Sequence, residues 1–210
     1  WESGRSPYVI LSDIKEGPLE KARANIRKYC PETEFDIRIG SGIQTIKPAE
    51  TDVVVIAGMG GLLIAEILGD DLEKSKTYKK FILQPRNGQS RLRAWLLENG
   101  FVIADEALVR ERKYLCEIIL AVPDRRNATS GTKASRTLKN TAMKEIDLEI
   151  SPILFAKKDP LLVEFIENKI RIEKKVYEAI KAGANKNKAG MLKKSEDRIA
   201  LLYELRKRSD

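Results

Sequence analysis

The sequence predicts an α/β fold: a doubly wound sheet that ends in an antiparallel hairpin and is followed by a helical hairpin. Short β-branched runs alternate with stretches of helical spacing through residues 1–123, as in sheets whose strands are joined by helices. The last two apolar runs, 101–109 and 115–122, are joined by only five residues, which indicates an antiparallel pair. From residue 159 onward, apolar side chains recur every three or four positions, which indicates helices.

Each element of the first 123 residues is marked by an apolar run or by a boundary residue. The predicted strands are 8–12, 35–39, 52–56, 80–83, 101–109 and 115–122. The predicted helices are 17–30, 62–68 and 90–98. Pro18 suits the first turn of a helix, Pro31 ends that helix, and Asn99-Gly100 ends the third one. This order is typical of a doubly wound sheet with an antiparallel edge.

The chain divides into three parts by composition and charge. Residues 1–123 form the α/β domain, 124–158 are predicted to be a basic linker, and 159–210 an antiparallel helical hairpin close to a short coiled coil. The first part holds 18 basic and 18 acidic side chains, so the whole net charge of +8 lies after it. Such asymmetry favours a polyanionic partner, nucleic acid above all. The alternative is a Lys-rich helical surface that is merely solvated.

Composition excludes several kinds of site. The chain has no histidine, which removes Ser-His and Cys-His catalysis. Its two cysteines, Cys30 and Cys116, form no CxxC pair, so neither a disulfide framework nor a zinc site is expected. No apolar run is long enough to span a membrane. We therefore expect a cytoplasmic protein without a metal or a membrane partner.

The most informative motif is the glycine-rich turn after the strand 52–56. Ligands of open α/β sheets bind at the carboxyl ends of strands, and the glycines of Gly58-Met-Gly-Gly61 allow close approach to the backbone. Asp13 precedes this turn by 45 residues, which is the wrong order for a dinucleotide phosphate loop. The order suits a nucleoside cofactor bound across the sheet, with Asp13 at the ribose and Gly42 beside the adenine. Either residue could instead have only a structural role, Asp13 at a strand end and Gly42 in an ordinary turn.

Several segments together resemble one protein family, the TrmK family of bacterial tRNA (adenine-22-N1)-methyltransferases, over almost the whole chain. They are Asp13-Ile-Lys-Glu-Gly-Pro-Leu-Glu-Lys-Ala22, Val54-Val-Ile-Ala-Gly-Met-Gly-Gly61, Ile82-Leu-Gln-Pro85 and Leu92-Arg-Ala-Trp-Leu96. The resemblance implies a Rossmann-like class I methyltransferase fold, S-adenosylmethionine as cofactor and tRNA as partner.

The resemblance also suggests roles for individual residues. The catalytic turn would be Ala57, Gly58, Met59 and Gly60. The cofactor would be bound by Asp13, Ile14, Ser41, Gly42, Ala57 and Gly58. Substrate RNA would meet Gln84, Arg86, Asn87, Arg91, Arg93, Lys174 and Lys175. The alternative for the four residues between 86 and 93 is the solvated start of a helix. Other cations of the helical hairpin, among them Lys169 and Lys186, would grip the tRNA backbone, and Tyr114 is a weaker candidate for stacking whose default role is strand packing.

The chain departs from the family at its N-terminus. The family's first strand and its Asp-rich cofactor loop would lie upstream of Trp1. That strand would sit between the strand that ends at Asp13 and the strand that ends at Ile56. An empty slot there would leave buried backbone groups unpaired, at about 1–3 kcal/mol each. We therefore expect upstream residues, or a retained clipped piece, to complete the sheet.

Other functions stay open at this point. One alternative is a methyltransferase of the same fold with a substrate other than tRNA, since fold alone does not fix the substrate. A non-catalytic RNA-binding protein with a degenerate cofactor site is a second alternative, and a dinucleotide oxidoreductase a distant third. For assembly we predict a monomer or a weak homodimer.

Overall fold

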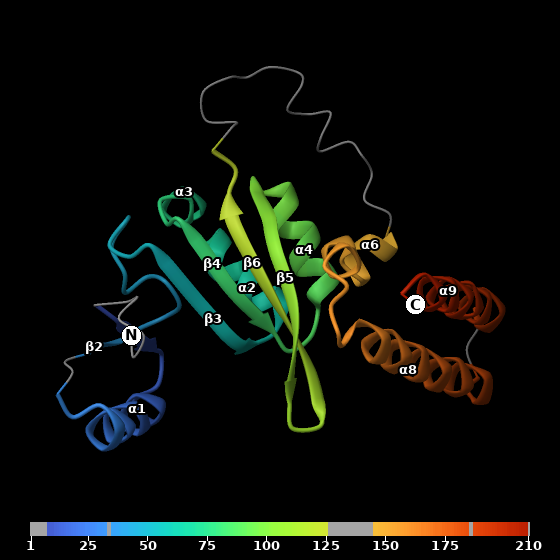
Figure 1. Ribbon diagram of the computed structural model, residues 1–210, viewed down its shortest axis with the longest axis horizontal. Helices are drawn as coiled ribbons and strands as arrows, with labels where there is room; N and C mark the ends of the chain where they lie inside the picture. The colour runs from blue at the N-terminus through green and yellow to red at the C-terminus, as the bar shows by residue number, and fades with distance from the viewer. Residues whose placement is uncertain (1–7, 33–34, 126–144, 185–186, 210) are drawn as a thin grey trace.

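The computed structural model describes residues 8–32, 35–125, 145–184 and 187–209, and it contains two sheets (Figure 1). In the smaller sheet, β1 (Ile10–Asp13) pairs in parallel with β2 (Asp36–Ile39). The larger sheet has the order β3-β4-β6-β5. Its strands are β3 (Val53–Met59), β4 (Lys80–Pro85), β5 (Phe101–Glu111) and β6 (Tyr114–Pro123). β3 and β4 are parallel, and β6 runs antiparallel to β4 and β5, which confirms the predicted hairpin at the edge.

The helices that were predicted are present, and the described residues form three short helices besides them. The predicted set is α1 (Glu16–Tyr29), α2 (Gly61–Gly69), α4 (Gln89–Glu98), α8 (Leu162–Ala182) and α9 (Lys188–Arg208). The additional helices are α3 (Leu72–Ser75), α6 (Glu145–Glu149) and α7 (Pro152–Ala156). The last two lie inside the range assigned to a linker, and helices of five residues are too short for a periodic signal.

The larger sheet is covered by α2 and α4, and a hydrophobic core fills the space between them. Phe81 and Leu83 of β4 are fully buried, as are Leu92 and Leu96 of α4. These positions alternate along the strand and repeat every four residues along the helix, so each element turns its apolar side to the same core. This packing fixes the carboxyl ends of β3 and β4, where the predicted site lies.

A second core joins the C-terminal helices to the sheet. α8 and α9 pack side by side, and Phe165, Ile166 and Leu202 are buried in a cluster that also holds Leu108 of β5 (Figure 1). The backbone N–H of Leu108 donates to Asp159 Oδ2 at 3.1 Å. The helical hairpin is therefore docked on the outer strand of the sheet.

The described strands leave a slot between the two sheets. β1 does not pair with β3, and a cavity of about 1090 Å³ lies between them. Its walls include Ile10–Asp13 on one side and Val53–Ala57 on the other. This is the position at which the sequence predicted a gap, between the strand ending at Asp13 and the strand ending at Ile56, and the prediction is confirmed for these residues.

A polar cluster around Arg38 ties β2 to the loop that leads into β3. The guanidinium donates to Glu50 Oε1 at 2.7 Å, to Asp36 Oδ2 at 2.6 Å and to the Thr45 carbonyl at 2.7 Å. The hydrogen bonds from Arg38 to Glu50 lower the pKa of the Glu50 carboxyl to about 2, with the backbone N–H of Lys47 as the next contribution.

The Arg38 cluster predicts acid sensitivity. Because the folded pKa of Glu50 lies below its usual value of 4.5, its stabilisation is present above about pH 4.5 and is lost as the pH falls toward 2. Urea unfolding of wild type and Glu50→Gln at several pH values should give a stability difference that is constant near neutrality and disappears in acid. The same profile for Glu98→Gln, an exposed residue with no ion pair in the described chain, should be flat. A Glu50→Gln difference that persists at pH 2 would contradict the assignment.

Candidate functional site

The glycine-rich turn lies at the carboxyl end of β3, where the strand is distorted by a bulge. The register to β4 shifts between Ala57 and Met59. Gly58 has a φ of 79°, in the region that favours glycine, and its N–H donates to Gln84 Oε1 at 2.8 Å. Gln84 was predicted to meet RNA, and the structure shows its carboxamide oxygen bound to the turn.

A second turn, Arg86–Gly88, follows β4 and is joined to the first by backbone hydrogen bonds. Arg86 N donates to the Met59 carbonyl at 2.8 Å, and Gly61 N donates to the Asn87 carbonyl at 2.8 Å. A Cβ on Gly61 would lie 2.6 Å from the Gly88 carbonyl oxygen, so the two backbones touch. The sequence did not single out Gly88 as a site residue, although Asn-Gly is a turn signal.

The side chains of the second turn lie over the first. The Arg86 guanidinium is 3.6 Å from where a Cβ of Gly58 would be, and Asn87 Oδ1 is 3.0 Å from the corresponding position at Gly60. Arg86 is exposed and has no carboxylate partner in the part of the chain that the structure describes. The structure therefore brings the predicted catalytic turn together with two predicted RNA residues, Arg86 and Asn87. Among the described residues, the guanidinium of Arg86 is the free cation beside this turn.

The predicted cofactor residues converge on the slot between the sheets. Asp13 and Gly42 line the cavity from one side, and Ala57 and Met59 line it from the other. Asp13 Oδ1 accepts from Lys15 N at 2.8 Å. Gly42 has a φ of 49°, and a Cβ there would lie 2.7 Å from Ile67 Cγ2 of α2. The turn that carries Gly42 is thus packed against the helix that starts at the catalytic turn.

Two other predicted cofactor residues, Ile14 and Ser41, are exposed beside these positions and do not line the cavity. Arg91 is exposed in the first turn of α4. All three residues are exposed and could still contact a large ligand, so their roles stay predictions.

The prediction that Arg93 meets RNA is wrong, because its side chain is only 1% exposed. Its guanidinium donates to Glu106 Oε1 at 2.8 Å, to Glu117 Oε2 at 2.5 Å and to the Leu148 carbonyl at 2.8 Å. Burial alone would lower the pKa of Arg93, but the charges of Glu117 and Glu106 raise it. Arg93 therefore joins α4 to β5, β6 and the segment of α6.

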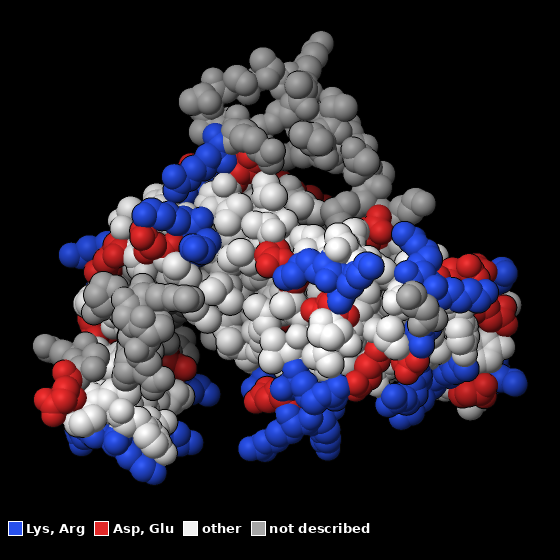
Figure 2. Space-filling model, in the orientation of Figure 1, with Lys and Arg blue, Asp and Glu red and all other residues white. Residues whose placement is uncertain are grey.

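The cations of the helical hairpin differ in exposure and in whether they have an ion-pair or hydrogen-bond partner. Lys175 is exposed and has no ion pair within the described ranges, whereas Lys174 donates to the Tyr203 hydroxyl at 2.7 Å. Lys169 is paired with Glu149 at 2.5 Å and is therefore not a free cation, and its contact with RNA stays a prediction. Lys186 lies outside the described residues. Figure 2 shows Lys and Arg gathered along the lower edge of the molecule, at the tip of the β5–β6 hairpin and over α8 and α9.

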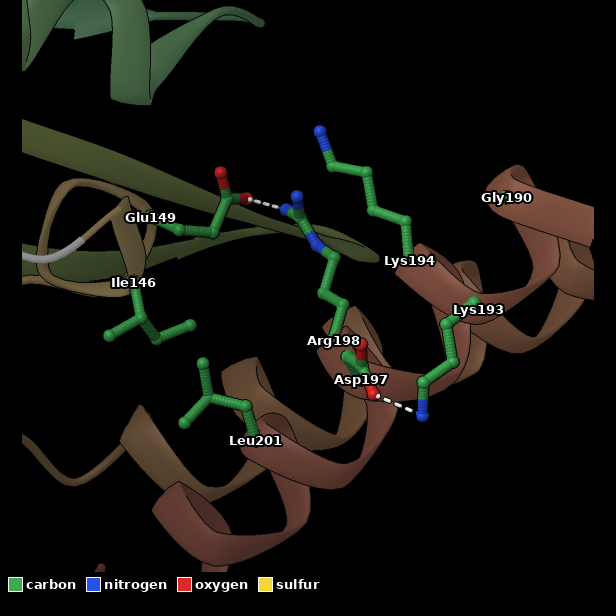
Figure 3. Close-up of a pocket in the computed structure, with 8 residues that line it drawn as sticks. All are labelled: Ile146, Glu149, Gly190, Lys193, Lys194, Asp197, Arg198 and Leu201. Carbon is green, nitrogen blue, oxygen red and sulfur yellow. Dashed lines mark ion pairs between the residues drawn. The ribbon is translucent and has the colours of Figure 1, made fainter.

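A smaller pocket of about 410 Å³ lies between α6 and α9 (Figure 3). Arg198 is paired with Glu149 at 3.1 Å, and Lys193 with Asp197 at 2.9 Å. Among the lining cations only Lys194 has no such partner in the described chain. The Arg198–Glu149 pair joins α6 to α9, whereas Lys193 and Asp197 lie on the same helix, so the pocket marks the packing boundary between α6 and the helical hairpin.

The described parts of the chain contain neither a cluster of metal ligands nor a helix suited to span a membrane. No three His, Cys, Asp or Glu side chains gather there as ligands for a metal ion. None of the helices described is both long and apolar enough to cross a membrane.

Comparisons with known proteins agree on one family. The family model for TrmK, described as tRNA (adenine(22)-N(1))-methyltransferase, matches residues 2–204. The tRNA (adenine(22)-N(1))-methyltransferase of Bacillus subtilis is 29% identical over 202 residues, which are 94% of this chain and 79% of that protein.

Solved structures of this kind share the fold. The crystal structure of Bacillus subtilis TrmK superimposes with a TM-score of 0.74 at 26% identity, covering 95% of this chain and 82% of that one. Sp1610 of Streptococcus pneumoniae gives a TM-score of 0.76 at 25% identity, with 98% and 84% covered. With a family match over nearly its whole length and the glycine-rich turn in place, this chain belongs to the TrmK family of tRNA (adenine(22)-N(1))-methyltransferases.

Proposed function

We propose that the chain transfers a methyl group from S-adenosylmethionine to N1 of adenine 22 in tRNA. The observation that carries the proposal is the end of the slot at which β1 and β3 finish, where Asp13, Gly42, Ala57 and Met59 lie together beside the joined glycine turns, beyond the part that a strand between β1 and β3 would fill. In a member of the TrmK family, this arrangement suits a nucleoside cofactor whose reactive group points at the turn.

The residues around the cavity fit such a cofactor. Asp13 offers a carboxylate to ribose hydroxyls, since Oδ2 has no partner in the described chain while Oδ1 is held by the Lys15 N–H. Gly42 leaves the edge of the cavity without a side chain, which gives a flat base access to the backbone. When bound, S-adenosylmethionine supplies an electrophilic methyl group on a sulfonium.

The chemistry asks little of the protein beyond positioning. N1 of adenine carries a lone pair at neutral pH, so its attack needs no general base, and a chain without histidine can support it. The task of Ala57–Gly60 is to hold the base in line with the methyl group, and positioning of this kind can supply much of a barrier. N1 lies on the Watson–Crick edge, so the base must be unpaired or flipped out.

The free cation Arg86 is best suited to phosphate. Methylation gives the adenine ring a positive charge, so a guanidinium beside N1 would oppose the reaction. A guanidinium bound to the phosphate of the same nucleotide would instead hold the strand and add affinity. The basic excess after residue 123 would bind the rest of the tRNA backbone in the same way.

The test is a methylation assay on defined tRNA. The protein is incubated with methyl-labelled S-adenosylmethionine and with unmodified transcripts that carry adenine or guanine at position 22. We expect label only in the adenine transcript, and mass spectrometry of its nucleosides should identify N1-methyladenine. Equal labelling of both transcripts would move the target to another position. No labelling of either would remove the enzymatic function.

A further inference from the structure

The β5–β6 hairpin extends well beyond the rest of the sheet. The last described pair between β4 and β6 is Leu83 with Ile119, whereas β5 and β6 continue for five more pairs, to Glu111 with Tyr114. At about 3.3 Å per residue this is an extension of about 16 Å. Figure 1 shows the hairpin projecting past the ends of β3 and β4, the edge at which the glycine turns lie.

The hairpin leaves the sheet next to Arg86. Cys116 of β6 interacts with the side chain of Gln84 and with the charge of Arg86, while burial and Glu111 raise the pKa of its thiol. Tyr114 is two residues from Cys116 on the same strand, so both side chains point to the same face. Arg86 lies beside Gly58, Cys116 beside Arg86, and Tyr114 next along the same face of β6, so these residues lead from the glycine-rich turn to the hairpin tip.

The tip itself is basic and carries an exposed aromatic ring. Tyr114 is 61% exposed, and Lys113 Nζ lies 5.4 Å from the centre of its ring. Arg112, at the turn with a φ of 54°, and Lys113 have no carboxylate partner in the described chain. An exposed aromatic ring between free cations is the combination that binds an unpaired base and its phosphates.

The C-terminal helices hold the hairpin on the side of β5. Arg110, four residues before Tyr114, is paired with Glu164 at the start of α8. Leu108 is buried in the core of the C-terminal helices. The hairpin therefore stands between the glycine turns and the basic helices, and RNA that contacts both must pass it.

We propose that the hairpin tip, Arg112–Tyr114, is a tRNA contact in which Tyr114 stacks on an unpaired base that flanks the target adenine while Arg112 and Lys113 hold the adjoining phosphates. The proposal rests on the proposed function and gives it a positioning residue outside the glycine turns.

The test compares two exposed Lys–Tyr pairs of the same chain. Tyr114→Leu should weaken tRNA binding between about 5-fold and 150-fold, as expected for the loss of one base–aromatic stack, and Tyr114→Phe should restore it. Tyr29→Leu is the matched control, because Tyr29 is 66% exposed, with Lys28 Nζ 4.8 Å from its ring centre, on α1 away from the turns. Its tRNA affinity should equal that of wild type.

Charge and stacking can be separated by salt. The double variant Arg112→Gln with Lys113→Gln should reduce the slope of log affinity against log salt by about 2, whereas Tyr114→Leu should leave the slope unchanged. S-adenosylmethionine binding should not change in any of these variants. If wild type methylates adenine 22 and Tyr114→Leu binds tRNA as tightly as wild type, this proposal fails alone. If wild type methylates no tRNA, the proposed function fails first.

Discussion

Replacing Arg93 by methionine is expected to destabilise the fold by about 3–5 kcal/mol. The substitution keeps the volume but leaves Glu106 and Glu117, both almost fully buried, without their shared cation. Glu106 Oε2 already has no hydrogen-bond partner in the described chain, so the site has no spare donor with which to compensate. Urea unfolding monitored by circular dichroism measures the loss directly.

Arg91→Met is the control for this experiment. Arg91 lies two residues earlier on α4 and is exposed, so its replacement should change stability by no more than about 0.5 kcal/mol. Adding Glu106→Met and Glu117→Met to Arg93→Met should recover most of the loss, because no unpaired charge then stays buried. A single variant Arg93→Met as stable as Arg91→Met would show that the three groups do not act as an ion-pair cluster.

Replacing Gly61 by alanine is expected to lower the rate of methyl transfer at least about 100-fold, since a displacement of about 1 Å costs that much in a positioned reaction. The added methyl would lie 2.6 Å from the Gly88 carbonyl oxygen and 2.9 Å from that of Asn87. Both are backbone atoms that cannot rotate away, so the two turns must separate and the hydrogen bond from Gly61 N to Asn87 O must lengthen. Single-turnover kinetics with saturating cofactor and tRNA measures the effect.

Gly17→Ala controls for the general effect of a lost glycine. A Cβ at Gly17, in the first turn of α1, meets nothing within 4 Å apart from its chain neighbours, so this variant should keep the wild-type rate. A Gly61→Ala protein that is folded and transfers methyl at the wild-type rate would show that contact between the turns is not needed for catalysis.

The sequence was sufficient for the arrangement of the strands and for the main parts of the site. β-branched runs and turn residues predicted every strand of the structure, and the short join at 110–114 predicted the antiparallel edge. The gap beside Asp13 was expected from the family resemblance, and the convergence of Asp13, Gly42 and Ala57 from the order of the motifs along the chain.

Side-chain partners could not be predicted in the same way. Arg93 and Arg91 are both arginines near the start of one helix, and only the position of Glu106 and Glu117 on β5 and β6 makes one of them a buried ion-pair residue. Lys169 is likewise taken up by Glu149, which lies on a helix that is too short for a sequence signal. Such pairs depend on tertiary distance, which periodicity does not report.

The docking of the helical hairpin on β5 has a consequence for how a target nucleotide would be chosen. Leu108, Asp159 and the Arg110–Glu164 pair hold α8 at a set place relative to the outer strand. A tRNA bound by these helices would then reach the glycine turns with a nucleotide at one fixed distance from the bound part of its backbone. Choice of a single adenine would come from the dimensions of the folded RNA, so lengthening or shortening the stem between grip and target should shift the modified position rather than abolish modification.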